Sequence, residues 1–414
     1  VGGHGDKAVA AAQGLEDKAP ASHLIEAAVL AGAAAPAGTD ALLSAEAKLV
    51  AGDAAGALTA ALAANGAGTG DAAVLVARSI VAGATLAEGT ELPEATDALV
   101  KWATSPDGSR ARRHASKAAA VKGWRADRLR AERGAAWGDK TVATAAYDAL
   151  AASSDPRAQL IGLLGKLDQA NAGVRRGVPD ADQASWASTA HGIAMAEGSL
   201  DQINRATHHA VASLKRRSDF AGALELAGQS KILAEAAEVD ATVASLSVAD
   251  AALLSGDPAY AFTVASAVRA ANSDATSAHH QAAAWTEGLA AWALGRTAEL
   301  DAAAVAARGP NKDALKALAA MGRGDLETAR LQFPPSGLDG QAAALVYGHA
   351  ALADGKNANK WHDKAISGAD NSGIPALGLS TRLAKESHLR VGNRRGAATL
   401  RRDISKRFGS GPAL

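Results

Sequence analysis

The chain contains no cysteine, only two methionines, and aromatic side chains at 3% of its 414 positions. Without cysteine, a disulfide-stapled fold and any metal site with thiolate ligands are excluded. Apolar residues still make up 48% of the chain, and alanine alone supplies about a quarter of all positions. Alanine is the best helix former and is depleted in strands. The composition therefore predicts an all-α protein that packs through small side chains.

Long hydrophobic runs are also missing. No stretch reaches the roughly 18 apolar residues that a membrane-spanning helix needs, and the nearest, residues 27–37, contains Gly32 and Pro36. We expect no membrane span, while peripheral membrane association stays open. The lack of cysteine and of an initiating methionine suggests an exported bacterial protein of the periplasm or cell envelope, with the cytoplasm as the alternative.

The charges balance overall but not locally. Lys plus Arg and Asp plus Glu both number 43. Residues 1–104 carry 5 basic and 12 acidic side chains, residues 105–140 carry 10 and 4, and residues 381–414 carry 9 and 2. Because the segments have opposite signs, we expect the basic ones to contact acidic protein surface, in this chain or in a neighbouring subunit.

The apolar pattern is helical throughout. Leu, Val or Ala recur at helical spacing over residues 40–64, 71–87 and 201–217, for example, and no strand-like alternation is sustained. Short Gly- or Pro-containing breaks separate the helices, at 66–70, 106–108, 173–180, 334–337 and 373–375. Such short connections predict antiparallel neighbouring helices.

A glycine turn recurs in the C-terminal half at a mean interval of 34 residues, at Gly256, Gly295, Gly324, Gly355 and Gly392. Gly52 and Ser218 look like earlier members of the series. Small residues recur seven positions before or five positions after these turns: Ala57, Ala223, Ala261, Gly288, Ala329, Gly348 and Ala397. Small side chains at fixed offsets predict close packing between the two helices of a hairpin.

This pattern resembles the tetratricopeptide repeat (TPR) family, most clearly over residues 200–414. The resemblance implies a right-handed α-solenoid of antiparallel helix hairpins, and another helix-hairpin array is the alternative. We expect acidic hairpins over 1–104, a basic and less regular helical region over 105–180, and TPR-like repeats with a basic C-terminal capping helix over 181–414.

The chain carries no standard catalytic or nucleotide-binding motif. Residues 162–166 are too short for a phosphate loop and lack its Ser or Thr. Neighbouring histidines, as in His208–His209 and His279–His280, point about 100° apart on a helix and cannot chelate one metal alone. We therefore expect no enzyme activity, no cofactor and no metal site.

The TPR resemblance implies protein–protein interaction, as a scaffold or as an accessory subunit of a larger complex. The candidate partner contacts are cations of the two basic segments: Arg110, Arg113, Lys117, Arg125, Arg128, Arg394, Arg395, Arg401 and Arg402. The alternative is a regulatory module that binds nucleic acid or another anionic ligand through residues 105–140. Nucleic acid is the less favoured partner, since the chain has no overall positive charge.

Overall fold

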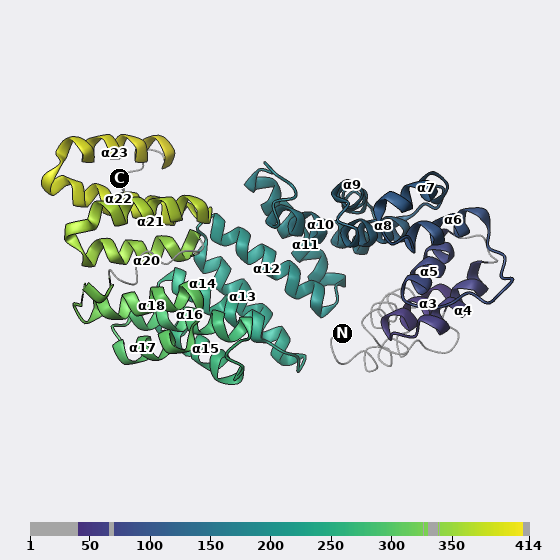
Figure 1. The fold of residues 1–414 in the computed structure, drawn as a ribbon, viewed down its shortest axis with the longest axis horizontal. Helices are drawn as coiled ribbons and strands as arrows, with labels where there is room; N and C mark the ends of the chain where they lie inside the picture. The colour runs from purple at the N-terminus through teal and green to yellow at the C-terminus, as the bar shows by residue number, and fades with distance from the viewer. Residues whose placement is uncertain (1–39, 66–69, 326, 330–337, 339, 409–414) are drawn as a thin grey trace. The chain divides into compact units, whose positions relative to one another are not determined.

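A computed structural model of the chain describes residues 40–65, 70–325, 327–329, 338 and 340–408 (Figure 1). About 80% of these residues are helical and none of them forms a strand, which confirms the all-α prediction. The predicted break at 334–337 and most of the one at 66–70 lie outside the described residues.

The chain divides into two compact units, called unit 1 (1–210 and 233–239) and unit 2 (211–232 and 240–414). The helices of unit 1 are α3 (Ala41–Val50), α4 (Ala54–Asn65), α5 (Gly70–Val81), α6 (Glu94–Ala103), α7 (Gly108–Ala118), α8 (Trp124–Ala136), α9 (Lys140–Ala151), α10 (Pro156–Asn171) and α11 (Asp180–Glu197). Two further helices, α12 (Leu200–Arg216) and α13 (Phe220–Ala236), contribute residues to both units. The division into three segments made from the sequence stays a prediction.

The remaining helices belong to unit 2. They are α14 (Thr242–Ser255), α15 (Pro258–Ala271), α16 (Ala278–Ala293), α17 (Thr297–Ala306), α18 (Gly309–Gly322), α20 (Gly340–Ala353), the short 3-10 helix η1 (Gly355–Asn357), α21 (Ala358–Ser372), α22 (Pro375–Gly392) and α23 (Arg394–Phe408).

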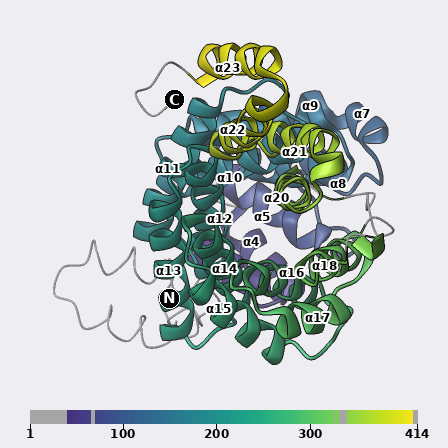
Figure 2. The ribbon, with the colours of Figure 1, turned by 90° about the vertical axis from the view of Figure 1, so that its left-hand side faces the viewer.

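Helices that follow one another in the sequence also pack against one another. In unit 2 this holds for α14 to α18 and again for α20 to α23, whose yellow-green ribbons lie side by side in Figures 1 and 2. Helices two apart in the sequence also contact each other, so that α14, α16, α18, α20 and α22 form a continuous series. In unit 1, α3 contacts α5, α6 contacts α8 and α8 contacts α10 in the same way, and α5 also contacts α8, three helices further along the chain. Consecutive hairpins therefore share one layer of helices, as expected for a helical repeat.

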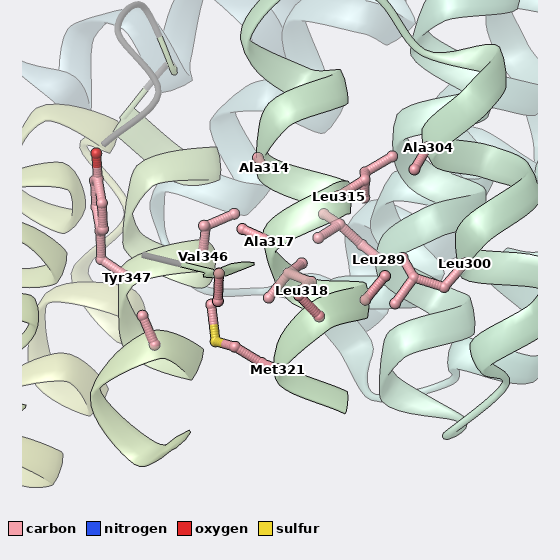
Figure 3. Packing of buried hydrophobic residues seen from close by; sticks show 14 of the residues in the cluster. Leu289, Leu300, Ala304, Ala314, Leu315, Ala317, Leu318, Met321, Val346 and Tyr347 are labelled. Carbon is pink, nitrogen blue, oxygen red and sulfur yellow. The ribbon is translucent and has the colours of Figure 1, made fainter. Parts of the chain in front are cut away.

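Small and branched aliphatic side chains fill the layer between hairpins. Figure 3 shows Leu289 of α16, Leu300 of α17 and Leu315 and Leu318 of α18 meeting at one point. Val346 of α20 extends the same cluster, and all five side chains are at most 5% exposed. A glycine at position 288 allows this contact, because a Cβ there would lie 2.6 Å from a Leu315 methyl carbon. The Leu315 side chain would have to shift if residue 288 carried a Cβ.

The hairpin turns share one local geometry. At Gly256 the chain enters the left-handed region, with φ +89°, and the next residue, Asp257, caps α15 by accepting the backbone N–H of Tyr260. The left-handed residue ends one helix and the aspartate begins the next. The backbone φ angle is also positive at Gly52, Ser218, Gly295 and Gly324. Gly355 and Gly392 differ, since the first begins η1 and the second is the last residue of α22.

The turn expected at Gly52 is present, and it separates α3 from α4 within the apolar run over 40–64. The helix expected over 71–87 is shorter than the apolar run, because α5 ends at Val81, ahead of Gly83 at φ +104°.

One turn of the same kind was not predicted from the sequence. Gly138 has φ +69°, and Asp139 accepts the backbone N–H of Val142, within the region expected to be less regular. Ala143, five residues after Gly138, is 3% exposed. The hairpin formed by α8 and α9 therefore has the same turn as those of unit 2.

The small residues singled out from the sequence are buried, with one exception. Ala57, Ala223 and Ala261 have no exposed surface, and Ala329 and Ala397 are 3% exposed. Gly348 is only half-buried, and a Cβ built on it would meet nothing within 4 Å. No neighbouring helix therefore requires a glycine at 348.

We expect Ala223→Leu to lower the free energy of unfolding by about 1–3 kcal/mol, because a larger side chain at a fully buried position overpacks its surroundings. Ala223 lies in a cluster with Val211, Val248 and Ala265 of unit 2. Urea denaturation of the full chain measures the change. A neutral effect would show that the helices around Ala223 are not packed as described.

Candidate functional site: an arginine-lined cavity in unit 1

The basic segment occupies α7 and α8, which Gly123 separates at φ +109°. On α7, Arg113 is exposed, and Arg110 lies 3.7 Å from Asp107 in an exposed ion pair. Lys117 donates a 2.6 Å hydrogen bond to Glu94 of α6. Exposed pairs of this kind contribute little to stability, so α7 presents its cations mainly to solvent.

Arg125 of α8, unlike the exposed cations of α7, forms largely buried ion pairs. Its guanidinium donates to both carboxylate oxygens of Glu46, at 3.3 and 2.9 Å, and to Asp71 at 2.9 Å. Glu46 is 2% exposed and the Arg125 side chain 13% exposed. The guanidinium carbon also lies 4.5 Å from the centre of the Trp124 ring. This candidate partner contact therefore lies between α3, α5 and α8, where it forms ion pairs with two acidic residues of the first segment.

A cavity of about 670 Å³ lies in unit 1. It falls within the range of roughly 300–1,000 Å³ that is usual for ligand sites. Helical periodicity explains its walls, because residues three, four or seven apart share a face. On α8, Trp124, Arg128 and Glu132 have this spacing, and Leu129, Ala131 and Arg133 of the same helix also line the cavity. The others include Glu46, Leu49 and Val50 of α3, Arg78 and Val81 of α5, Tyr147 of α9, Arg157, Ile161 and Leu164 of α10, and Asp201, Gln202 and Arg205 of α12.

Helices α5 and α8 contribute several arginines to the cavity wall. Arg128 donates to Glu132 at 2.8 Å, and Arg78 lies 3.6 Å from the same carboxylate. Burial, followed by the positive charge of Arg128, lowers the pKa of Arg78. Arg133 also lines the cavity, stacks over Trp137 and donates to the backbone carbonyl of Ser105. Its Nε is buried and has no acceptor among the described residues.

The α12 end of the cavity is held by an ion-pair network. Asp168 of α10 accepts hydrogen bonds from Arg205 at 2.6 Å and from His209 at 2.9 Å. Partial burial alone would raise the pKa of Asp168, but the bonds from His209 and Arg205 and the Arg205 charge outweigh it and lower that pKa. Arg205 is thus neutralised within unit 1, unlike Arg133.

Aliphatic side chains at the rim are exposed. Val50 and Val81 have 51% and 39% of their surface in solvent, and both line the cavity. Tyr147 and the Trp124 ring add aromatic surface. The cavity thus offers apolar surface, cations and the carboxylates of Glu132 and Asp201 in one place.

The second set of candidate contacts lies on the C-terminal helix of unit 2. Arg394 and Arg395 of α23 are exposed and make no ion pair with another described residue. Arg402 is exposed too and donates to the backbone carbonyl of Ala398 at 3.4 Å. Arg401 lies 3.7 Å from Glu386. Ala397 and Ile404 form the buried face of α23, so the cations cover its outer face.

One histidine of each pair, His209 and His280, is buried in the packing. His209 binds Asp168, and Nδ1 of His280 lies 2.7 Å from the carbonyl oxygen of Asn272. Among the described residues no group of three or more His, Asp or Glu side chains is arranged to hold a metal ion.

No family model matches the chain. No curated protein and no solved structure matches it either. The structure by itself shows an all-helical chain whose helices pack in neighbouring pairs, which is compatible with a helical repeat. In the part of the chain that the structure describes, no helix is long and apolar enough to cross a membrane.

Of the cavity-lining arginines, only Arg128 is among the partner contacts chosen from the sequence. Arg78, Arg157 and Arg205 lie outside the two basic segments, each on a helix without an unusual charge pattern. Only their helical spacing to apolar neighbours, such as Arg157 to Ile161, shows that they share a face with apolar residues. No local signal indicates that these faces meet.

Proposed function

We propose that the chain is a non-catalytic protein-binding module, a right-handed TPR-like solenoid that serves as a scaffold or accessory subunit of a larger complex. In this proposal the cavity of unit 1 receives a segment of the partner protein. The observation that carries the proposal is the mixed lining of the cavity, with two exposed valines at its rim and charges of both signs inside. A peptide segment is a ligand that offers side chains and backbone groups to match such a surface.

A polyanion fits this cavity less well. Its walls include Glu132 and Asp201, whose carboxylates would repel a phosphate backbone. Arg125 is already neutralised inside unit 1. Helix α7, with exposed Arg110 and Arg113, is the observation that favours the second candidate function, a regulatory module that binds nucleic acid or another anionic ligand.

The test is selection from a display library of short random peptides with the full chain as bait. We expect binders whose affinity falls about tenfold, roughly 1.4 kcal/mol, in Val81→Asp, because the charge removes an apolar contact at the rim. Val243→Asp is the matched control, since Val243 is similarly exposed but lies on α14 of unit 2. Equal loss in both variants, or no selected peptide, would contradict the proposal.

A labelled single-stranded DNA tests the second candidate. A complex that neutralises about six phosphates should weaken by roughly 10³-fold between about 50 and about 200 mM salt, through counterion release. Peptide binding in the cavity should depend on salt far less. Sub-micromolar DNA binding at physiological salt that is lost on replacing Arg110 and Arg113 with glutamine would favour the regulatory module.

A further inference from the structure

Three of the arginines that line the cavity, Arg78, Arg128 and Arg133, have one directly paired carboxylate among them. Arg78 and Arg128 share Glu132, at 3.6 and 2.8 Å. Arg133 makes no ion pair with a described residue. Glu46 also lines the cavity, but its carboxylate is bound by Arg125. The group formed by Arg78, Arg128 and Arg133 therefore holds three positive charges against the one carboxylate that pairs with it directly.

A cation that is partly withdrawn from water is stabilised by an anion with matching geometry. The guanidinium fork matches the planar carboxylate, which can take two parallel hydrogen bonds. Glu132 shows that a carboxylate fits between two of these arginines, and the buried Arg133 Nε is a donor still without an acceptor. The lowered pKa of Arg78 has the same origin, namely burial beside a second cation.

We propose that Arg78, Arg128 and Arg133 form an oxyanion site inside the cavity. Its ligand is a carboxylate-type anion, which competes with Glu132 for Arg128 and gives Arg133 the counter-charge it lacks. The anion is either a free small acid or an acidic side chain of a bound partner segment, and in the second case the inference rests on the proposed function. Val50 and Val81 would then hold the aliphatic part of that segment.

The proposal predicts opposite changes in anion affinity when Arg133 and Glu132 are replaced. Arg133→Gln removes a cation of the site, and we expect it to weaken anion binding about tenfold. Glu132→Gln removes the competing carboxylate, and we expect it to strengthen binding by a similar factor. A purely structural role for these side chains would weaken binding in both variants. Arg113→Gln is the matched control, because Arg113 is an exposed cation of the same basic segment that does not line the cavity.

The experiment uses the full chain and two kinds of probe, calorimetric titration with succinate and with inorganic phosphate, and the peptide display library. Thermal unfolding of each variant checks that the fold is kept, and Arg128→Gln replaces Arg133→Gln if the latter unfolds. Succinate binding that falls in Arg133→Gln and rises in Glu132→Gln supports the site with a free acid as ligand. Selected peptides rich in Asp or Glu that follow the same order support it with a partner side chain.

The results distinguish failure of the oxyanion site from failure of the protein-binding function. Selected peptides that lack acidic residues and bind both variants as tightly as the wild type would overturn the oxyanion site. The protein-binding function would still be supported. Succinate binding in the expected order without any selected peptide would support the site and contradict the protein-binding function. Tighter binding of phosphate than of succinate, unchanged in Arg133→Gln, would overturn the site.

Discussion

Replacing Arg125 with glutamine should lower the free energy of unfolding by about 3–5 kcal/mol, as expected when a buried ion pair loses one partner. Glutamine cannot neutralise Glu46, which is 2% exposed and receives two hydrogen bonds from Arg125. Asp71 would lose its partner at the same time. Urea denaturation of the full chain measures the loss.

A second variant separates the buried charge from lost packing. Arg125→Met combined with Glu46→Met removes both charges, and most of the stability should return, since apolar residues often replace a buried pair without cost. Arg113→Gln, in the same basic segment but exposed, should leave denaturation unchanged. Arg125→Gln with wild-type stability and impaired peptide binding would instead make Arg125 a partner contact.

The second large loss of stability is expected when Gly162, in the middle of α10, is replaced. A Cβ there would lie 2.2 Å from the backbone nitrogen of Ala151 and 2.6 Å from the carbonyl carbon of Leu150. Backbone atoms cannot move aside as a flexible side chain can, so Gly162→Ala must push α9 and α10 apart. We expect a loss on the order of 3 kcal/mol, despite the gain of about 1 kcal/mol that alanine brings to a helix interior.

Gly192 provides the control for this prediction. It lies within α11, and a Cβ built on it meets nothing within 4 Å. Gly192→Ala should therefore stabilise the chain by about 0.5–1 kcal/mol through helix propensity alone. If both variants changed the denaturation midpoint in the same direction, the close contact of α9 with α10 would be wrong. Such a contact is the structural reason for the glycine at 162, in a segment that resembles a phosphate loop only by composition.

The helices and turns follow from signals that lie within a few residues of each other. A left-handed Gly256 followed by Asp257 ends one helix and caps the next, and both effects are local. The repeat of this signal made the hairpins predictable over the C-terminal half. The turn at Gly138 and Asp139 has the same chemistry but stands outside the glycine series, so spacing alone did not reveal it.

The packing between hairpins was only partly predictable. Alanines at fixed offsets, such as Ala223 and Ala261, are buried where the pattern indicates. Gly348 has the same offset as Gly288, yet only Gly288 is in close contact with a neighbouring helix. The offset determines which face of its own helix a residue occupies, whereas the distance to the next helix depends on side chains elsewhere in the chain.

The amino-acid sequence by itself determined that the chain is helical, where its hairpins turn and which segments carry opposite charge. Tertiary structure decided what each cation does. Arg113 and Arg125 carry the same signal in the same basic segment, but one faces solvent and the other is held between Glu46 and Asp71. Likewise, α5 and α8 together supply the arginines around Glu132. Desolvation and Coulomb energy depend on distances between helices that are remote in sequence, and no local pattern encodes those distances.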